Sequence, residues 1–247
     1  SRRVPRPRPR ICPLLASTAA FTGREAELAQ LAKILAAGGR ASISAVTGMG
    51  GIGKTTLAVE AAWQASESFP DGILFLDLGG FGPSPLTPEA ALANLIAQVE
   101  PTLRPPEGLA QLGAAYRSLL AGHRMLLLLD NARNQAQLRP LLPPEPVALL
   151  ATSRVPLRLP GVQPLELEAL PQAEARTLLR SALHGRSADD ADLAGIAAAC
   201  ARLPIALRAA GAFLAEHPGW TIPDYLAALA KKRLPHLASE DDPALDV

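Results

Sequence analysis

Two hydrophobic patterns follow one another along the chain: short apolar runs, and stretches in which an apolar residue recurs every three or four positions. Three short runs, at residues 73–78, 125–130 and 147–152, are apolar almost throughout, which predicts strands buried on both faces, as in parallel sheets. A shorter strand is expected at residues 41–46, and residues 163–167 alternate like a strand at a sheet edge. Between the strands, apolar residues recur every three or four positions, which predicts helices. We therefore expect an α/β fold with a parallel five-stranded sheet flanked by helices.

A glycine-rich segment lies between the first expected strand and the next helix. Residues 48–56 read Gly-Met-Gly-Gly-Ile-Gly-Lys-Thr-Thr and contain the Gly-x-x-x-x-Gly-Lys-Thr pattern of a phosphate-binding loop, or P-loop. Glycines let successive N–H groups turn towards an anion, and the helix start adds more of them. A chance glycine-rich turn is the alternative. The pattern predicts that ATP or ADP is bound by Gly48, Gly50, Gly51, Ile52, Gly53, Lys54, Thr55 and Thr56.

Specific roles follow for residues at this loop and at two later strand ends. Lys54 would reach the β- and γ-phosphates, and the Thr55 hydroxyl would bind Mg²⁺. The run at 125–130 ends in Asp130, and a carboxylate at the end of a strand beside a P-loop can also hold Mg²⁺. Arg154 follows the next run, where an arginine could reach the γ-phosphate. By spacing alone, an exposed loop arginine is the simpler interpretation of Arg154.

The pattern changes after Pro171, where the strand signal ends. Four helical segments follow, at residues 171–183, 189–200, 204–215 and 221–231. Such a shift predicts a domain boundary. The expected parts are a Pro/Arg-rich linker (1–20), a P-loop nucleotide-binding domain (21–169), a small helical-bundle subdomain (170–237) and an acidic tail (238–247).

Composition narrows the function classes. The net charge of +1 over 247 residues gives no general basic field for nucleic acid. Residues 1–10 alternate arginine and proline, which we interpret as a linker, with a basic arm for nucleic acid as the alternative. Cys12 and Cys200 have no metal-binding spacing, and no apolar run has membrane-spanning length. We expect a cytoplasmic protein with no membrane contact and no direct nucleic-acid binding.

Residues 22–25 match a helix-capping pattern. They read Thr-Gly-Arg-Glu, the Ser/Thr-x-x-Glu capping box, so Thr22 is expected to cap a helix that ends at Gly38. Such a helix start can lie beside the nucleotide in a P-loop fold. On capping alone, a structural role is the simpler interpretation.

Several motifs stand in a fixed order along the chain. They are Phe21-Thr22-Gly23-Arg24-Glu25, the P-loop, Leu129-Asp130-Asn131, Thr152-Ser153-Arg154, and Arg202-Leu203-Pro204-Ile205-Ala206-Leu207. Together they resemble the NB-ARC branch of the STAND ATPases, over about residues 21–237. This family includes plant disease-resistance proteins, apoptotic-protease activators and bacterial regulators. Residues 126–142 and 200–225 look most like NB-ARC proteins of the actinobacterial antibiotic-regulator type.

The resemblance implies further roles. The backbone around Thr22 and Arg24 would contact adenine or phosphate, Arg154 would sense the γ-phosphate, and Pro204 would pack on the adenine. Family members switch between a closed ADP state and an open ATP state that oligomerises. Effector and sensor domains of the same protein would be further partners, together with a winged-helix subdomain whose histidine contacts ADP in relatives.

The chain departs from the family pattern at two of the motifs named above. Many members carry two acidic residues at the end of the Asp130 strand, but here Asn131 follows Asp130. A carboxylate that could polarise the attacking water is therefore missing there, and we predict at most a slow ATPase. The glycine of the family's Gly-Leu-Pro-Leu segment is Arg202.

We expect a nucleotide-controlled switch module of a signalling or transcription-regulating protein. One alternative is a turnover ATPase or kinase, which the P-loop and Asp130 would support equally well. Another is a DNA-loading ATPase of the origin-recognition kind, which should carry a basic face that only residues 2–10 offer.

Overall fold

The computed structural model describes residues 21–45 and 50–236. The chain divides into two compact units, of which the first ends at Glu168 and the second begins at Ala169. Each unit buries its own hydrophobic cluster. The two units are therefore described one after the other.

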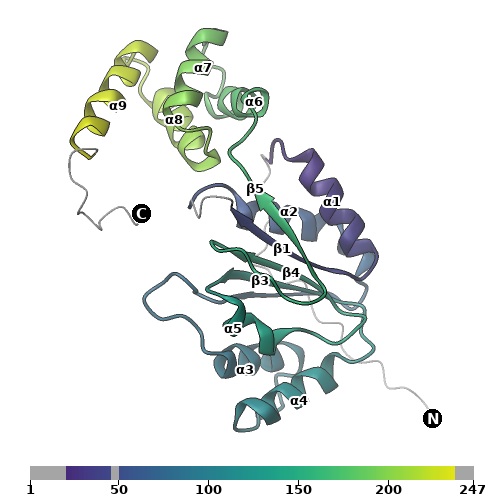
Figure 1. Ribbon diagram of the computed structural model, residues 1–247. Helices are drawn as coiled ribbons and strands as arrows, with labels where there is room; N and C mark the ends of the chain where they lie inside the picture. Colours follow the sequence, from purple (N-terminus) through teal and green to yellow (C-terminus); the bar gives the residue numbers. More distant parts are fainter. Residues whose placement is uncertain (1–20, 46–49, 237–247) are drawn as a thin grey trace. The chain divides into compact units, whose positions relative to one another are not determined.

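The first unit is built on a parallel sheet in the order β2-β3-β4-β1-β5 (Figure 1). Its strands are β1 (Arg40–Ala45), β2 (Ile73–Asp77), β3 (Leu126–Ala132), β4 (Ala148–Ser153) and β5 (Val162–Leu167). The central strand is β4, the P-loop strand β1 lies beside it, and β2 and β5 are the two edge strands. β3, which carries Asp130, is not a direct neighbour of β1, because β4 lies between them and pairs with both.

Helices cover both faces of this sheet. Helices α1 (Glu25–Ala36) and α2 (Lys54–Gln64) pack on one face, while α3 (Pro88–Val99) and α4 (Leu109–Leu120) lie on the other (Figure 1). Short helical turns complete the unit: η1 (Ser66–Ser68), α5 (Gln135–Leu138) and η2 (Arg139–Leu141). The predicted class of fold, a parallel sheet flanked by helices, is confirmed.

Side-chain alternation determines what each face of β3 carries. Leu127 and Leu129 join the cluster formed with α3 and α4. Successive strand residues point to opposite faces, so Leu128 and Asp130 face the side of α2. The strand therefore delivers a single carboxylate, at its carboxyl end, towards the start of α2.

The start of α1 differs from the expected capping box. The N-cap residue is Arg24, at a left-handed φ of 67°, and it makes no side-chain cap hydrogen bond. Thr22 is therefore not the cap. The Arg24 side chain is buried and donates to Glu27 Oε1 at 2.7 Å and to the Glu168 carbonyl oxygen at 2.6 Å. It joins α1 to the chain that follows β5.

The second unit is a bundle of four described helices. They are α6 (Gln172–Ala182), α7 (Asp190–Ala199), α8 (Pro204–Glu216) and α9 (Ile222–His236). Helices α6 and α8 approach closely at Gly211, where an added Cβ would lie 2.4 Å from Ala182 Cβ. Only a glycine permits this approach of the two helices.

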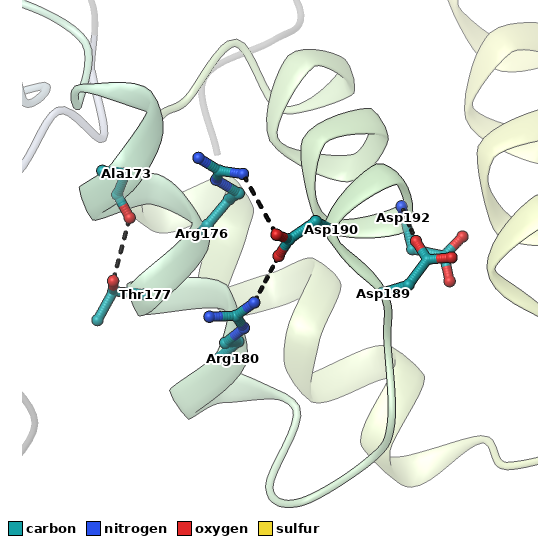
Figure 2. Close-up of polar contacts among 7 residues, drawn as sticks. All are labelled: Ala173, Arg176, Thr177, Arg180, Asp189, Asp190 and Asp192. Atoms are coloured by element: carbon teal, nitrogen blue, oxygen red, sulfur yellow. Dashed lines mark hydrogen bonds and ion pairs between the residues drawn. The ribbon is translucent and has the colours of Figure 1, made fainter.

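Polar contacts also join α6 to α7. Asp190 lies 2.5 Å from an Arg180 nitrogen and 4.0 Å from an Arg176 nitrogen (Figure 2). Asp189 caps α7 by accepting from the Asp192 N–H at 2.7 Å. All these side chains are partly or fully exposed, so the ion pairs add little stability and mainly favour one register of the helices.

Within the described residues, no helix is both long enough and apolar enough to cross a membrane.

Candidate nucleotide-binding site

Helix α2 begins directly at the glycine-rich segment. Its first residue is Lys54, and the residue before it, Gly53, has φ of 94°. Gly51 also has a positive φ, of 75°, a backbone conformation that side chains with a Cβ rarely adopt. The first N–H groups of a helix have no acceptor within the helix, so they are available to an anion. Gly48 lies outside the described residues.

Thr55, the second residue of α2, contacts the carboxylate at the end of β3. Its hydroxyl donates to Asp130 Oδ1 at 2.9 Å and lies 3.0 Å from Oδ2. The Thr152 hydroxyl, from β4, donates to the same Oδ1. Asp130 is 7% exposed and Thr152 is 1% exposed, so these hydroxyls largely replace water around the carboxylate. The structure thus brings together two predicted metal ligands, Thr55 and Asp130.

A β-bulge follows Asp130. Leu129 pairs with Ala151 but Ala132 pairs with Ser153, so β3 contains one extra residue. Asn131 takes the strained position, at φ of 57°, a region that asparagine tolerates better than most residues. Its N–H donates to Thr152 Oγ1 at 2.9 Å. Thr152 therefore both accepts from the bulge and donates to Asp130.

The charges of the site perturb one another. Burial raises the pKa of Asp130, and the charge of Asp77 raises it further, while the hydroxyls of Thr152 and Thr55 oppose the change. Burial lowers the pKa of Lys54, as does the positive charge of Arg154, while Asp130 acts in the opposite direction. Lys54, Asp130 and Arg154 therefore interact electrostatically near the carboxyl ends of the parallel strands. The polyanionic phosphates of a nucleotide would relieve the repulsion between the two cations.

Arg154 follows β4, and its guanidinium lies over an aromatic ring. The guanidinium carbon is 4.9 Å from the centroid of Phe81, which belongs to the segment between β2 and α3. A cation within about 6 Å of a ring centroid is attracted by the negative face of the ring. Arg154 is half-buried, so the interpretation as a simple exposed loop arginine does not describe it.

The other predicted site residues are Thr22, Arg24 and Pro204. Thr22 and Arg24 precede α1, and the Arg24 side chain is already engaged in structural contacts. Pro204 is the first residue of α8, in the second unit. The residue where the family has glycine, Arg202, has φ of 56°, so the structure gives a physical reason for a glycine there.

Sequence reasoning missed two residues of this site. Thr152 was identified only as part of a motif, although a hydroxyl at the end of a strand next to Asp130 could have suggested a partner. Phe81 lay in a segment rich in glycine and proline and carried no periodic signal. Among the described residues, no group of three or more His, Cys, Asp or Glu side chains could hold a metal ion.

The sheet order and the cluster at the start of α2 define a P-loop nucleotide-binding fold. A model of the NB-ARC domain family matches residues 24–148, which is half of the chain. The chain belongs to the NB-ARC domain family, and its first unit is a nucleotide-binding module of that class.

Two relatives are proteins called regulatory protein AfsR. That of Streptomyces coelicolor is 38% identical over 242 residues, which cover 92% of this chain and 24% of the relative. That of Streptomyces griseus is 40% identical over 230 residues, covering 90% of this chain and 24% of the relative. The chain thus spans about a quarter of the length of the curated relatives it matches.

Solved structures share the fold. The ORC2 protein of Aeropyrum pernix, solved with ADPNP and ADP, has a TM-score of 0.59 at 17% identity, covering 88% of this chain and 71% of that one. A STAND protein with a tetratricopeptide-repeat sensor, from Pyrococcus horikoshii, has a TM-score of 0.50 at 18% identity, covering 78% and 30%. At these identities the likeness shows the fold alone.

Proposed function

We propose that this chain is the ADP/ATP-binding switch module of a larger STAND-type regulatory protein. The observation that carries the proposal is the cluster at the start of α2, where Lys54, Thr55 and Asp130 meet at the carboxyl end of the sheet. Ligands of parallel α/β folds bind at this end of the strands. In this proposal Lys54 binds the β- and γ-phosphates, and glycine-segment N–H groups surround them.

The residues present fit Mg²⁺. The ion prefers oxygen ligands in an octahedron with bonds of about 2.0–2.1 Å, which places neighbouring oxygens about 2.9 Å apart. Thr55 Oγ1 and the Asp130 oxygens already lie at 2.9 and 3.0 Å. The hydroxyl and the carboxylate would hold the ion directly or through water, and phosphate oxygens would complete its shell. The bound ion would neutralise phosphate charge.

Switching needs a group that interacts differently with ADP and ATP, because a ligand shifts an equilibrium only by its differential affinity. Arg154 is the candidate for the γ-phosphate, which only ATP supplies. Pro204, in the second unit, is the candidate for packing on adenine, with the backbone at Thr22 and Arg24 as further contacts. The helical unit would then close on the nucleotide in one state and release it in the other.

Hydrolysis is proposed to be slow. Asn131 stands where a second carboxylate would activate water, and an amide is a much weaker base. Asp130 is surrounded by two hydroxyl donors, which suits a metal ligand better than a general base. Turnover at rates typical of kinases, about 1–100 s⁻¹, would contradict this part of the proposal.

The proposal also concerns the other domains and the cellular role of the protein that contains this module. Regulatory relatives that are about four times longer support an association of this module with other domains of the same protein. These relatives are called regulatory proteins, which supports a role in regulation, and we propose that this role includes transcription. ATP-dependent self-association and a cytoplasmic location complete the proposed behaviour.

The decisive experiment identifies the nucleotide released when the purified chain is denatured. Chromatography that finds stoichiometric ADP would support a resting switch held by the two units alone. An empty site that binds both nucleotides reversibly would support nucleotide recognition and assign the locking of ADP to other domains. Lys54→Ala should abolish binding, and Asp130→Ala should mainly remove its Mg²⁺ dependence. Folded protein that binds neither nucleotide would overturn the proposal.

A further inference from the structure

Phe81 places a partly exposed aromatic ring beside Arg154. Phe81 is 37% exposed, so the ring contributes little to the buried core. Its face lies 4.9 Å from the Arg154 guanidinium carbon, within the range of an attractive cation–π interaction. An exposed aromatic ring beside the predicted phosphate-sensing arginine therefore calls for a functional explanation.

The segment that carries Phe81 is anchored on the site. The Gly80 N–H donates to the Asn131 carbonyl oxygen at 2.8 Å, directly at the bulge after Asp130. The Gly79 N–H donates to Asp77 Oδ1 at 2.8 Å, which ties the other side to the end of β2. Both residues immediately before Phe81 are thus attached to the ends of neighbouring strands.

Side-chain bonds fix the rest of the segment. Gln137, which is buried, donates to the carbonyl oxygens of Leu78 and Leu86 at 3.2 and 2.8 Å. The Leu86 N–H closes the segment by donating to the Leu78 carbonyl oxygen at 3.0 Å. The ring of Phe81 is therefore presented by a loop whose two ends are joined to each other and to α5.

Arg154 shares this site with another cation, Lys54. The guanidinium of Arg154 and the ammonium of Lys54 carry like charges, so the two side chains repel one another. The ring of Phe81 offsets part of this repulsion, because its face attracts the guanidinium.

We propose that Phe81 is a positioning residue for Arg154, holding the guanidinium beside the phosphate site before a nucleoside triphosphate binds. This inference rests on the proposed function, in which Arg154 contacts the γ-phosphate. A pre-positioned guanidinium loses less side-chain freedom on binding, so the ring increases the affinity for ATP more than for ADP.

The test measures dissociation constants of ATP and ADP, each with Mg²⁺, by calorimetry. Phe81→Leu removes the aromatic face but keeps apolar bulk, and Phe81→Tyr keeps the face. We expect Phe81→Leu to weaken ATP binding about two- to fivefold, the size of an exposed cation–π pair, with little change for ADP. Phe81→Tyr should retain the ATP-to-ADP affinity ratio. Equal urea midpoints of the nucleotide-free variants would exclude a folding defect.

Arg154→Ala and the double variant separate the inference from the proposed function. If Phe81 acts through Arg154, Phe81→Leu should change nothing further once Arg154 is alanine. An effect that persists in the double variant would mean that the ring contacts nucleotide itself and would overturn the inference. So would an unchanged or an increased ATP preference in Phe81→Leu. If Arg154→Ala leaves the affinity ratio unchanged, the sensing role of Arg154 is wrong, whatever Phe81 does.

Discussion

The hydroxyl of Thr55 donates to Asp130 at 2.9 Å although a whole strand, β4, lies between the strands that lead to these two residues. The contact arises because α2 crosses the sheet face from β1 and contacts both β3 and β4. The intervening strand is also used, since Thr152 at its end donates to the same carboxylate. The orientation of Asp130 is therefore set from two elements, by hydroxyls that approach from different directions.

Removing the Thr152 hydroxyl should loosen this arrangement. Thr152→Val keeps the shape but leaves the Asn131 N–H without its acceptor and Asp130 without one donor. We expect a loss of about 1–3 kcal/mol in the free energy of unfolding, measured with urea. The hydrogen bond from Thr152 lowers the pKa of Asp130, so the pKa should rise further when the hydroxyl is removed. As the pH is lowered, Asp130 of the variant should therefore be protonated first, and Mg²⁺-dependent ATP binding should be lost at a higher pH than in the unmodified chain. Thr152→Ser, which keeps the hydroxyl, should restore the pH profile.

The raised pKa of Asp130 predicts a dependence of stability on pH. The folded chain binds the Asp130 proton more readily than the unfolded chain does, so protonation of Asp130 stabilises the fold. This contribution is fully present below the ordinary pKa of 3.8 and is lost as the pH rises through the raised pKa. At neutral pH the ionised carboxylate is thus a cost, which Asp130→Asn removes. In the absence of nucleotide, Asp130→Asn should unfold at a higher temperature at pH 7, with the difference vanishing in acid.

Nucleotide should reverse that order. Mg²⁺ and ATP stabilise only a chain that binds them, so the unmodified chain should gain more in melting temperature than Asp130→Asn. Scanning calorimetry with and without saturating MgATP gives both comparisons. A lower melting temperature of the nucleotide-free variant at pH 7 would mean that the hydrogen bonds of Asp130 outweigh its burial.

The positions of the strands could be predicted from the sequence, because they depend on the local pattern of hydrophobic residues. Apolar runs placed Asp130 and Arg154 at strand ends, and the Gly-Lys-Thr pattern placed Lys54 at the start of a helix. The order of the strands could not be predicted, because the pairing of β4 with both β1 and β3 depends on contacts between segments that are far apart in the sequence. The bulge at Asn131 follows from that pairing, and the place of Phe81 follows in turn from the bulge. Thr22 fitted a capping box by spacing, but Arg24 begins the helix in a left-handed conformation that spacing does not reveal.

Gly80 should tolerate no side chain. An added Cβ would lie 2.3 Å from the Arg133 nitrogen and 2.4 Å from the Asn131 oxygen, and both atoms are backbone. Gly80→Ala must therefore separate the segment from the bulge and break the hydrogen bond to Asn131. We expect a loss of about 1–3 kcal/mol in the free energy of unfolding, together with weaker ATP binding as Phe81 moves.

Gly82 provides the matched control for this change. It lies in the same segment, but its added Cβ would meet only the Gly79 oxygen, at 3.4 Å. Gly82→Ala should change the free energy of unfolding by less than about 0.5 kcal/mol. Equal effects of the two substitutions would show that the segment yields easily, and the anchoring of Phe81 would be disproved.

The end of α7 carries backbone strain that a glycine should relieve. The Arg202 N–H donates to the Ala197 carbonyl oxygen and the Ala201 N–H to that of Ala198, the paired bonds of a Schellman motif. Ala201 and Arg202 both have left-handed φ values, of 49° and 56°. This conformation costs a residue with a Cβ about 1–2 kcal/mol, of which the greater unfolded freedom of glycine cancels about half. Arg202→Gly should therefore raise the free energy of unfolding by up to about 1 kcal/mol.

Arg202→Ala distinguishes relief of strain from loss of the arginine side chain. Alanine removes the exposed guanidinium but keeps the Cβ, so it should give no stabilisation if backbone conformation is the cause. Urea unfolding followed by circular dichroism compares the three chains, and hydrogen exchange at the amides of α7 and α8 locates the change. Protection should increase there for the glycine variant alone. An equal gain for alanine would assign the effect to the charge of Arg202 instead of its backbone conformation.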